Sequence, residues 1–187
     1  VGRFAEAWRH FDSRWNVKSF NSKRFEFNKP LLEIGDKVNC LFIYGEQGLG
    51  DQLLYSSMLS EINLVSQKTY VLVERRLVTL LQRSFKKVKF IDSIDESIFF
   101  EKYIALGSIG KFFINSTNDF SKLSNSFLKS DHQKSQQLRN ELVPKRQLLC
   151  GISWKSKSGK TGKNKSLELE DFLPLFKLDR KSTRLNS

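Results

Sequence analysis

The feature of this sequence that most constrains its fold is an apolar segment that ends at a glycine-rich turn and leads into an amphipathic segment. The apolar run VNCLFIY, Val38–Tyr44, has the length of a buried strand. The turn Gly45-Glu46-Gln47-Gly48-Leu49-Gly50-Asp51 follows it. Over the next segment, Asp51–Val65, one helical face carries Leu53, Leu54, Met58, Leu59 and Ile62. This order of strand, turn and helix predicts the beginning of a parallel α/β sheet.

The alternation of strands and helices continues to about residue 110. Further strands are predicted at Thr69–Glu74, Val88–Asp92 and Tyr103–Leu106, and a second helix at Leu77–Phe85. Parallel strands are joined by right-handed crossovers that return over the sheet. Residues 36–110 are therefore expected to form one parallel sheet flanked by helices.

Residues 1–30 precede this unit and are predicted to contain a helix and a connector. The side chains of Phe4, Trp8, Phe11 and Trp15 follow one another at steps of four, three and four, which places them on one helical face. The segment from Asn21 to Pro30 mixes polar and aromatic residues without a clear period. We expect the helix to pack outside the sheet and the connector to be extended.

Two further stretches complete the chain. Residues 111–147 are rich in polar side chains and are interpreted as an interdomain connection, with a loop at residues 115–126 and a polar helix near His132–Leu142. Residues 148–187 predict a strand at Leu148–Trp154, a lysine-rich loop and a helix from about Leu167 to Phe176. One strand and one helix cannot bury a core, so this stretch is expected to be the truncated start of a second domain.

Composition and charge narrow the class of protein. Lysine and arginine number 32 against 20 acidic residues, a net charge of +12 that suits anionic partners such as nucleic acid, phosphorylated substrates or an acidic membrane surface. The 39% of hydrophobic residues suffices for a packed core. No segment approaches the roughly 20 apolar residues of a membrane span. No signal peptide is visible, so a cytoplasmic location is the default expectation. Cys40 and Cys150 lie in apolar runs and are expected to be buried free thiols. No histidine, cysteine and acid spacing suggests a metal site.

The glycine turn resembles two nucleotide-binding motifs without matching either. Gly45 and Gly50 have the gap of a phosphate-binding G-x-x-x-x-G-K-[ST] loop, but Asp51 and Gln52 stand where lysine and a hydroxyl are needed. The glycine order also departs from the dinucleotide pattern, although Glu74 ends the next strand and keeps nicotinamide nucleotide binding open. Glycines at the carboxyl end of a strand let backbone N–H groups approach a ligand. The alternative is that Asp51 only caps the helix.

The lysine-rich loop also has two interpretations. Five lysines without an acid fall within eleven residues, at Lys155, Lys157, Lys160, Lys163 and Lys165. The loop is either a solvated segment or a binding site for a diphosphate or another polyanion. A nucleic-acid groove usually adds stacking aromatic side chains, and only Trp154 lies near. Nucleic acid is therefore the less favoured partner.

The order of these segments resembles a bacterial protein type in which tetratricopeptide repeats precede a glycosyltransferase domain similar to the heptosyltransferases, glycosyltransferase family 9. Residues 2–15 resemble the last repeat helix and its junction, and the turn at residues 45–51 closely matches the family's E-Q-G-L-G-D sequence. Residues 151–156 resemble the strand that opens the family's second domain. Lys165-Ser166-Leu167, with Leu169 and Phe172, resembles the entry into its next helix. The resemblance covers about residues 1–176.

This resemblance implies a GT-B architecture, in which two Rossmann-like domains face a cleft. Residues 1–30 would be the end of a tetratricopeptide-like repeat with its connector, and residues 36–110 the acceptor-side domain. Residues 111–147 would connect the domains, and residues 148–187 would begin the domain that binds a nucleotide-sugar. Residues 180–187 resemble a foreign, adapter-encoded tail. The fragment would be a metal-independent sugar transferase, inactive alone, with a glycan or protein as acceptor and a protein partner for the upstream repeats.

The resemblance also assigns the candidate site residues. Asp51 is the expected general base for the acceptor hydroxyl, and Glu46 is the second choice. Gly48, Gly50, Ser153, Lys155 and Lys165 are the expected substrate-binding or phosphate-binding residues, with Lys165 the best candidate to meet a donor phosphate. The alternatives left open are a repeat-linked binding or scaffold module without chemistry and a basic nucleic-acid binder.

Overall fold

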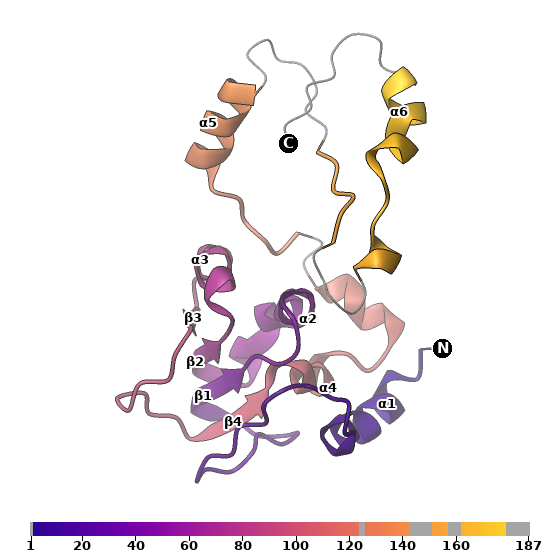
Figure 1. The fold of residues 1–187 in the computed structure, drawn as a ribbon. Helices are drawn as coiled ribbons and strands as arrows, with labels where there is room; N and C mark the ends of the chain where they lie inside the picture. The colour runs from indigo at the N-terminus through magenta and orange to yellow at the C-terminus, as the bar shows by residue number, and fades with distance from the viewer. Residues whose placement is uncertain (1, 124–125, 143–150, 157–161, 179–187) are drawn as a thin grey trace. The chain divides into compact units, whose positions relative to one another are not determined.

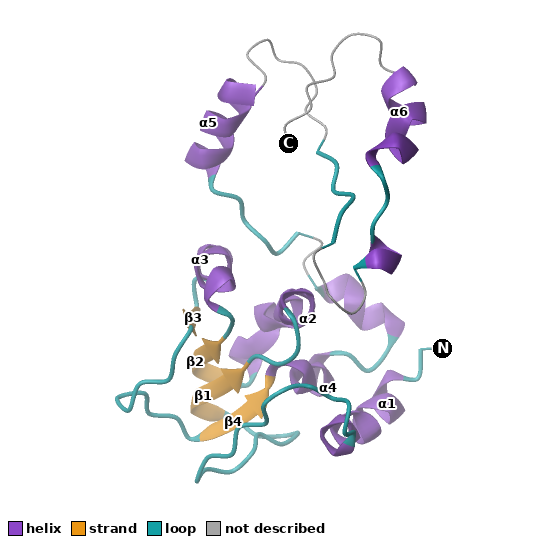
Figure 2. Cartoon of the chain, viewed as in Figure 1, coloured by secondary structure: helices purple, strands orange, loops and turns teal. Residues whose placement is uncertain are grey.

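The computed structural model describes residues 2–123, 126–142, 151–156 and 162–178. The chain divides into two compact units, Val1–Asp131 and His132–Ser187 (Figure 1). The first unit holds a sheet with its helices, and the second contributes helices and loops (Figure 2).

The first unit is built on a four-stranded sheet in which all strands are parallel. The strands are β1 (Val38–Tyr44), β2 (Ser66–Leu72), β3 (Val88–Ile91) and β4 (Lys102–Ala105), in the order β3-β2-β1-β4. In the central strand, Phe42 pairs with Tyr70 of β2 on one side and with Tyr103 of β4 on the other. This mixed α/β unit is consistent with a Rossmann-like fold, and the predicted parallel sheet is confirmed.

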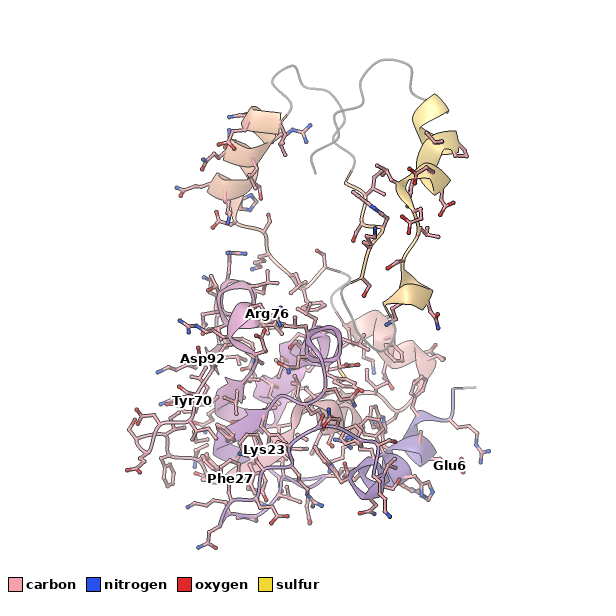
Figure 3. All side chains as sticks on the ribbon, viewed as in Figure 1. Glu6, Lys23, Phe27, Tyr70, Arg76 and Asp92 are labelled. Atoms are coloured by element: carbon pink, nitrogen blue, oxygen red, sulfur yellow. The ribbon has the colours of Figure 1, made fainter. Side chains whose placement is uncertain are left out.

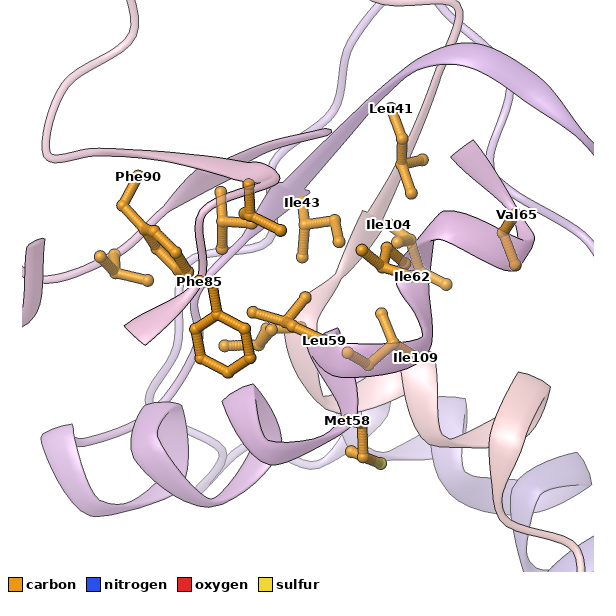
Figure 4. Packing of buried hydrophobic residues seen from close by; sticks show 14 of the residues in the cluster. Leu41, Ile43, Met58, Leu59, Ile62, Val65, Phe85, Phe90, Ile104 and Ile109 are labelled. Atoms are coloured by element: carbon orange, nitrogen blue, oxygen red, sulfur yellow. The ribbon is translucent and has the colours of Figure 1, made fainter. Parts of the chain in front are cut away.

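Helices cover one face of this sheet. α2 (Leu49–Ser56) continues into a 3-10 helix, η2 (Ser57–Leu64), and α3 (Arg75–Ser84) follows β2. The predicted single helix over Asp51–Val65 is therefore divided in two. These elements bury one apolar cluster with alternate side chains of β1, which Figure 4 shows around Ile43, Leu59 and Ile62. The period-two alternation of β1 and the helical spacing of the apolar residues after it make the two surfaces fit.

The opposite face of the sheet is covered differently. Here the extended segment of residues 17–35 places Phe25 and Phe27 (the latter labelled in Figure 3) against a second apolar cluster that includes Phe42 and Tyr103. The connection from β3 to β4 adds Phe100, whose ring stacks on that of Phe42 with centroids 4.9 Å apart. The prediction of an extended connector is correct, but its role as the cover of this face was not predicted.

The amino-terminal helix packs beside the sheet. α1 (Phe4–Phe11) and the 3-10 helix η1 (Asp12–Asn16) precede the connector, and α1 contacts α4 (Gly110–Phe113). The Trp8 indole donates a hydrogen bond to the carbonyl of Ile114. Between β4 and α4 lies the 3-10 helix η3 (Leu106–Ile109), and a further 3-10 helix, η4 (Thr117–Lys122), occupies part of the stretch predicted as a loop.

The second unit begins with α5 (His132–Leu142), as predicted. Its described residues continue with the short 3-10 helices η5 (Lys163–Lys165) and η6 (Leu169–Phe172) and with α6 (Leu173–Leu178). Residues 148–150 of the predicted strand and the predicted tail at 180–187 lie outside the described residues, and residues 151–156 form no regular element. Among the helices that the structure describes, none has the length and apolarity needed to cross a membrane.

Candidate functional site

The strand order creates a switch point between β1 and β4. From β1 the chain moves to β2 and β3 on one side and then returns to β4 on the other side. Open α/β sheets bind ligands outside the carboxyl ends of their strands at such a point. The glycine turn leaves the carboxyl end of β1, and η3 leaves the carboxyl end of β4. The candidate site is therefore formed by these two connections.

The first glycine of the turn is required by packing. The Gly45 N–H donates to the carbonyl of Leu72 at 2.6 Å, and a Cβ at Gly45 would lie 2.9 Å from that same oxygen. The buried amide of Gln52 also approaches here and accepts a hydrogen bond from the Glu74 N–H at 2.9 Å. The beginning of α2 is thereby fixed against the end of β2.

The candidate base, Asp51, is the third residue of α2. Its Oδ2 accepts a hydrogen bond from the Gly48 N–H at 3.1 Å, which satisfies one of the free donors at the helix start. The carboxylate is half-buried, whereas Gly48 and Gly50 are exposed. Gly48 has an extended backbone that any residue adopts, and a Cβ at Gly50 would meet open space. The fold itself therefore requires glycine at neither position.

Glu46, the second candidate, lies in a different environment. Its side chain is fully buried and receives the Arg14 guanidinium, whose Nη2 donates to both carboxylate oxygens at 2.9 Å. The Gly107 N–H donates to the same carboxylate, and a Cβ at Gly107 would lie 2.0 Å from Oε1. Burial raises the pKa of Glu46 above its ordinary value, although the hydrogen bonds and charge of Arg14 act in the opposite direction. In this conformation the carboxylate is paired and closed to solvent.

The Arg14 side chain extends this ion pair into a network. Its Nη2 also donates to the Ser108 hydroxyl at 2.8 Å, and that hydroxyl donates to Oδ1 of Asp12 at 2.7 Å. Burial alone would raise the pKa of Asp12, but the hydrogen bonds from Ser108 and Arg14 lower it. η1, the glycine turn and η3 are thus joined by one set of charged contacts.

Sequence reasoning missed Arg14, Gly107 and Ser108. Arg14 carried a signal that could have been used, because it lies three residues after Phe11 and beside Trp15 on the apolar stripe of the first helix. A charged side chain on a face that is otherwise buried needs a buried partner. Gly107 and Ser108 carried no comparable signal, since their importance depends on the position of Glu46.

A small cavity opens beside this network, on the side of the aromatic connector. Its volume is about 80 Å³. The residues that line it come from η1, the connector and the ends of β1 and β4, namely Asp12, Trp15, Arg24, Leu31, Leu32, Tyr44, Ile104, Ala105, Ser108 and Lys111. Burial, and to a lesser extent the charge of Glu46, raises the pKa of Tyr44 to about 12, so its hydroxyl stays protonated at neutral pH.

The remaining predicted site residues belong to the second unit. Ser153 and Lys155 are exposed, and Lys155 Nζ lies 3.7 Å from Oε2 of Glu168. Lys165 ends η5 and is exposed. The Ser166 hydroxyl accepts from the Ser156 N–H at 2.9 Å, which ties the two halves of the lysine-rich loop together. Residues 157–161 of this loop lie outside the described residues.

The predicted site residues therefore fall into two groups, one in each unit, and only the first group lies at the candidate site described above. Glu46, Gly48, Gly50 and Asp51 lie together in the turn after β1. Ser153, Lys155 and Lys165 lie in the second unit. Within the described ranges, no three histidine, cysteine or acidic side chains gather as metal ligands would. Cys40 is buried and free, as expected, and Cys150 lies outside the described residues.

These features define an α/β protein with a glycine turn at the switch point of a parallel sheet. Comparison with known proteins adds one relative: the chain is 33% identical over 93 residues to Protein FlbA of Caulobacter vibrioides. The match covers 48% of this chain and 16% of that protein, so the chain spans only a small part of its relative. No family model and no solved structure matches the chain.

Proposed function

We propose that this chain is part of a sugar transferase of GT-B architecture that moves a glycosyl unit from a nucleotide-sugar to an acceptor without a metal. The unit around the parallel sheet is the acceptor side, and the second unit begins the donor side. The observation that carries this proposal is the turn Gly45–Asp51 at the carboxyl end of β1, beside the switch point with β4. The same turn carries the resemblance to the heptosyltransferases.

An exposed glycine at the start of α2 supports a ligand at this turn. Gly50 lies in the first turn of α2, and glycine is less stable than alanine by up to about 1 kcal/mol in a helix interior. Gly48 is the N-cap residue, a position where glycine is common. Neither Gly48 nor Gly50 is needed by packing or by backbone conformation. The absence of a side chain at these positions leaves space for a substrate to approach the backbone at the start of α2.

The proposed reaction assigns a proton transfer to Asp51. The acceptor hydroxyl oxygen forms a bond to the anomeric carbon of the donor while the bond from that carbon to the nucleotide phosphate breaks. The hydroxyl proton passes to the Asp51 carboxylate, and the nucleotide leaves with the bonding electrons. Attack from the face opposite the phosphate inverts the anomeric carbon. Lys155 and Lys165 would bind the charge of the departing phosphates, with Ser153 as a hydrogen-bonding partner.

A non-catalytic binding module is the second candidate. It is favoured by the size of the cavity beside the network, because about 80 Å³ is far below the roughly 300–1,000 Å³ of small-molecule sites. It is also favoured by Glu46, which is paired and buried instead of open to a substrate. In this alternative the glycine turn has only a structural role, and Asp51 acts only as a helix cap.

The two candidates differ in the binding of nucleotide-sugars. We expect the complete protein to bind at least one member of a nucleotide-sugar panel in calorimetry and Lys165→Ala to weaken this binding by tenfold or more, about 1.4 kcal/mol. Lys86→Ala is the control, because Lys86 is exposed next to the amino end of β3. Binding to no member of the panel would support the non-catalytic module. Salt-sensitive binding to DNA in its place would support the nucleic-acid alternative.

A further inference from the structure

The amino-terminal segment forms hydrogen bonds with two successive residues of the glycine turn, Glu46 and Gln47. Arg14 of η1 binds the Glu46 carboxylate through Nη2 at 2.9 Å, and its Nε lies 3.3 Å from Oε2. The hydroxyl of Ser22, in the connector that follows, accepts a hydrogen bond from the Gln47 N–H at 2.7 Å. Both partners lie more than twenty residues before the turn in sequence.

Two features of the structure at Glu46 and Gln47 fit these contacts. A Cβ at Gly107 would lie 2.0 Å from the Glu46 carboxylate. The connection after β4 therefore has room for this carboxylate because residue 107 is glycine. Gln47 has a positive φ of 60°, a conformation that side-chain-bearing residues seldom adopt without support. Gln47 stands between the residue fixed by Arg14 and the glycine whose N–H binds Asp51. A change in the Gln47 backbone would shift the neighbouring Gly48 N–H, to which the Asp51 carboxylate is hydrogen-bonded.

Stability alone is a weak explanation for a buried ion pair. The cost of removing both charges from water often equals or exceeds their mutual attraction, and in some proteins such pairs serve to fix one conformation. Here the pair joins a helix that is not part of the sheet to the turn that bears the candidate base. The Ser108 and Asp12 contacts hold the guanidinium in its orientation.

We propose that Arg14 is a positioning residue, which acts through Glu46 to keep the glycine turn, and hence Asp51, in one conformation. In this arrangement η1 controls the conformation of the turn, because a displacement of η1 removes the Arg14 guanidinium from Glu46. The effect of Arg14 on the conformation of the turn does not depend on the proposed chemistry. The effect of Arg14 on turnover rests on the proposed function.

Hydrogen exchange measured on the full chain tests the holding of the turn directly. In Arg14→Met, we expect the amides of residues 46–52 to exchange about tenfold faster or more, while those of β1 and β2 keep their protection. Arg3→Met is the matched control, since Arg3 is exposed at the amino end of α1 and its ion pair, among described residues, is with Glu6 and not with the turn. Unchanged exchange at residues 46–52 in Arg14→Met would overturn the proposal.

A second variant separates positioning from the effect of a lone buried charge. Arg14→Met/Glu46→Met removes both charges, so the fold no longer holds an unpaired carboxylate. We expect the double variant to protect the sheet as the original chain does and still to show fast exchange in the turn. Slow exchange there would show that the single variant acted only through the buried charge, and this would overturn the proposal even if Arg14→Met alone does not fold.

Kinetics on the complete protein distinguish this inference from the proposed function. If the protein transfers sugar, Arg14→Met is expected to lower kcat by about tenfold or more with little change in KM for the donor. Equal losses in Arg14→Met and Arg3→Met would overturn the positioning role. A complete protein without transfer activity whose turn nevertheless loosens in Arg14→Met would overturn the proposed function and support the positioning role.

Discussion

Two glycines at the candidate site show how differently single residues can be constrained. Gly107 faces the Glu46 carboxylate so closely that even a methyl group would overlap Oε1 at 2.0 Å. Gly50 lies in the first turn of α2 with nothing within 4 Å of the position of a Cβ. The first glycine is thus required by the fold, and the second is not. This contrast yields a matched pair of substitutions.

Gly107→Ala is expected to destabilise the protein by about 1–3 kcal/mol, because the added methyl group displaces a buried carboxylate from its partners. Gly50→Ala is expected to leave stability unchanged or to raise it by up to about 1 kcal/mol through helix propensity. Urea denaturation measures both values. A Gly107→Ala variant as stable as the original chain would show that the close approach at Glu46 is not a feature of the folded protein in solution.

At the scale of elements, the connector between the first helix and β1 acts as a structural layer. The Phe27 ring packs edge to face against the rings of Phe42, Phe100 and Tyr103, at centroid distances of 5.3, 5.2 and 4.9 Å. These contacts cover the sheet face that α2 and α3 leave open. An extended segment can bury this face because its aromatic side chains supply large apolar surfaces without a helix.

Phe27→Ala is therefore expected to cost about 2–3 kcal/mol of stability, below the roughly 3–5 kcal/mol for a fully buried large aromatic side chain, because Phe27 is only partly buried. Phe99→Ala is the control, since the Phe99 side chain is 65% exposed and lies next to the stacked Phe100. Thermal unfolding compares the two variants. If both melt alike, the connector does not form part of the core, and the second face of the sheet must be covered in another way.

The sequence predicted the elements more reliably than the contacts between them. β1 and α5 have the bounds expected from their patterns, and β2, β3, β4 and α3 lie within a few residues of theirs. These patterns are local, so a period in the side chains is enough to predict them. The aromatic cover and the Arg14–Glu46 pair join residues that are far apart in sequence, and no local period encodes such a partner.

In the candidate site, too, the local features could be predicted from the sequence and the contacts between distant segments could not. The turn at residues 45–51 was predicted at the carboxyl end of β1, and the structure places it there. Its position beside η3 depends on β4 pairing with β1 instead of β3, which the sequence does not specify. The contacts of Arg14 with Glu46 and Ser108 depend on η1, the turn and η3 meeting in the fold, so no single segment of the sequence indicates them.

At the scale of the whole molecule, the candidate residues divide between two units. The glycine turn and the ion-pair network belong to Val1–Asp131, and the lysine-rich loop belongs to His132–Ser187. A transferase needs a donor side and an acceptor side, and the proposed function assigns one to each unit. The net charge of +12 suits a substrate that carries phosphates. The proposed function therefore depends on Asp51 acting as the base in the complete protein.

The most direct test is sugar-transfer turnover of the complete protein with Asp51→Asn. Asparagine keeps an oxygen that can accept the Gly48 N–H and preserves the shape of the side chain, but it cannot take the acceptor proton. We predict a variant of near-normal melting temperature with turnover lowered by about two decades or more. Turnover within about threefold of the original protein would contradict this prediction and leave Asp51 as a helix cap.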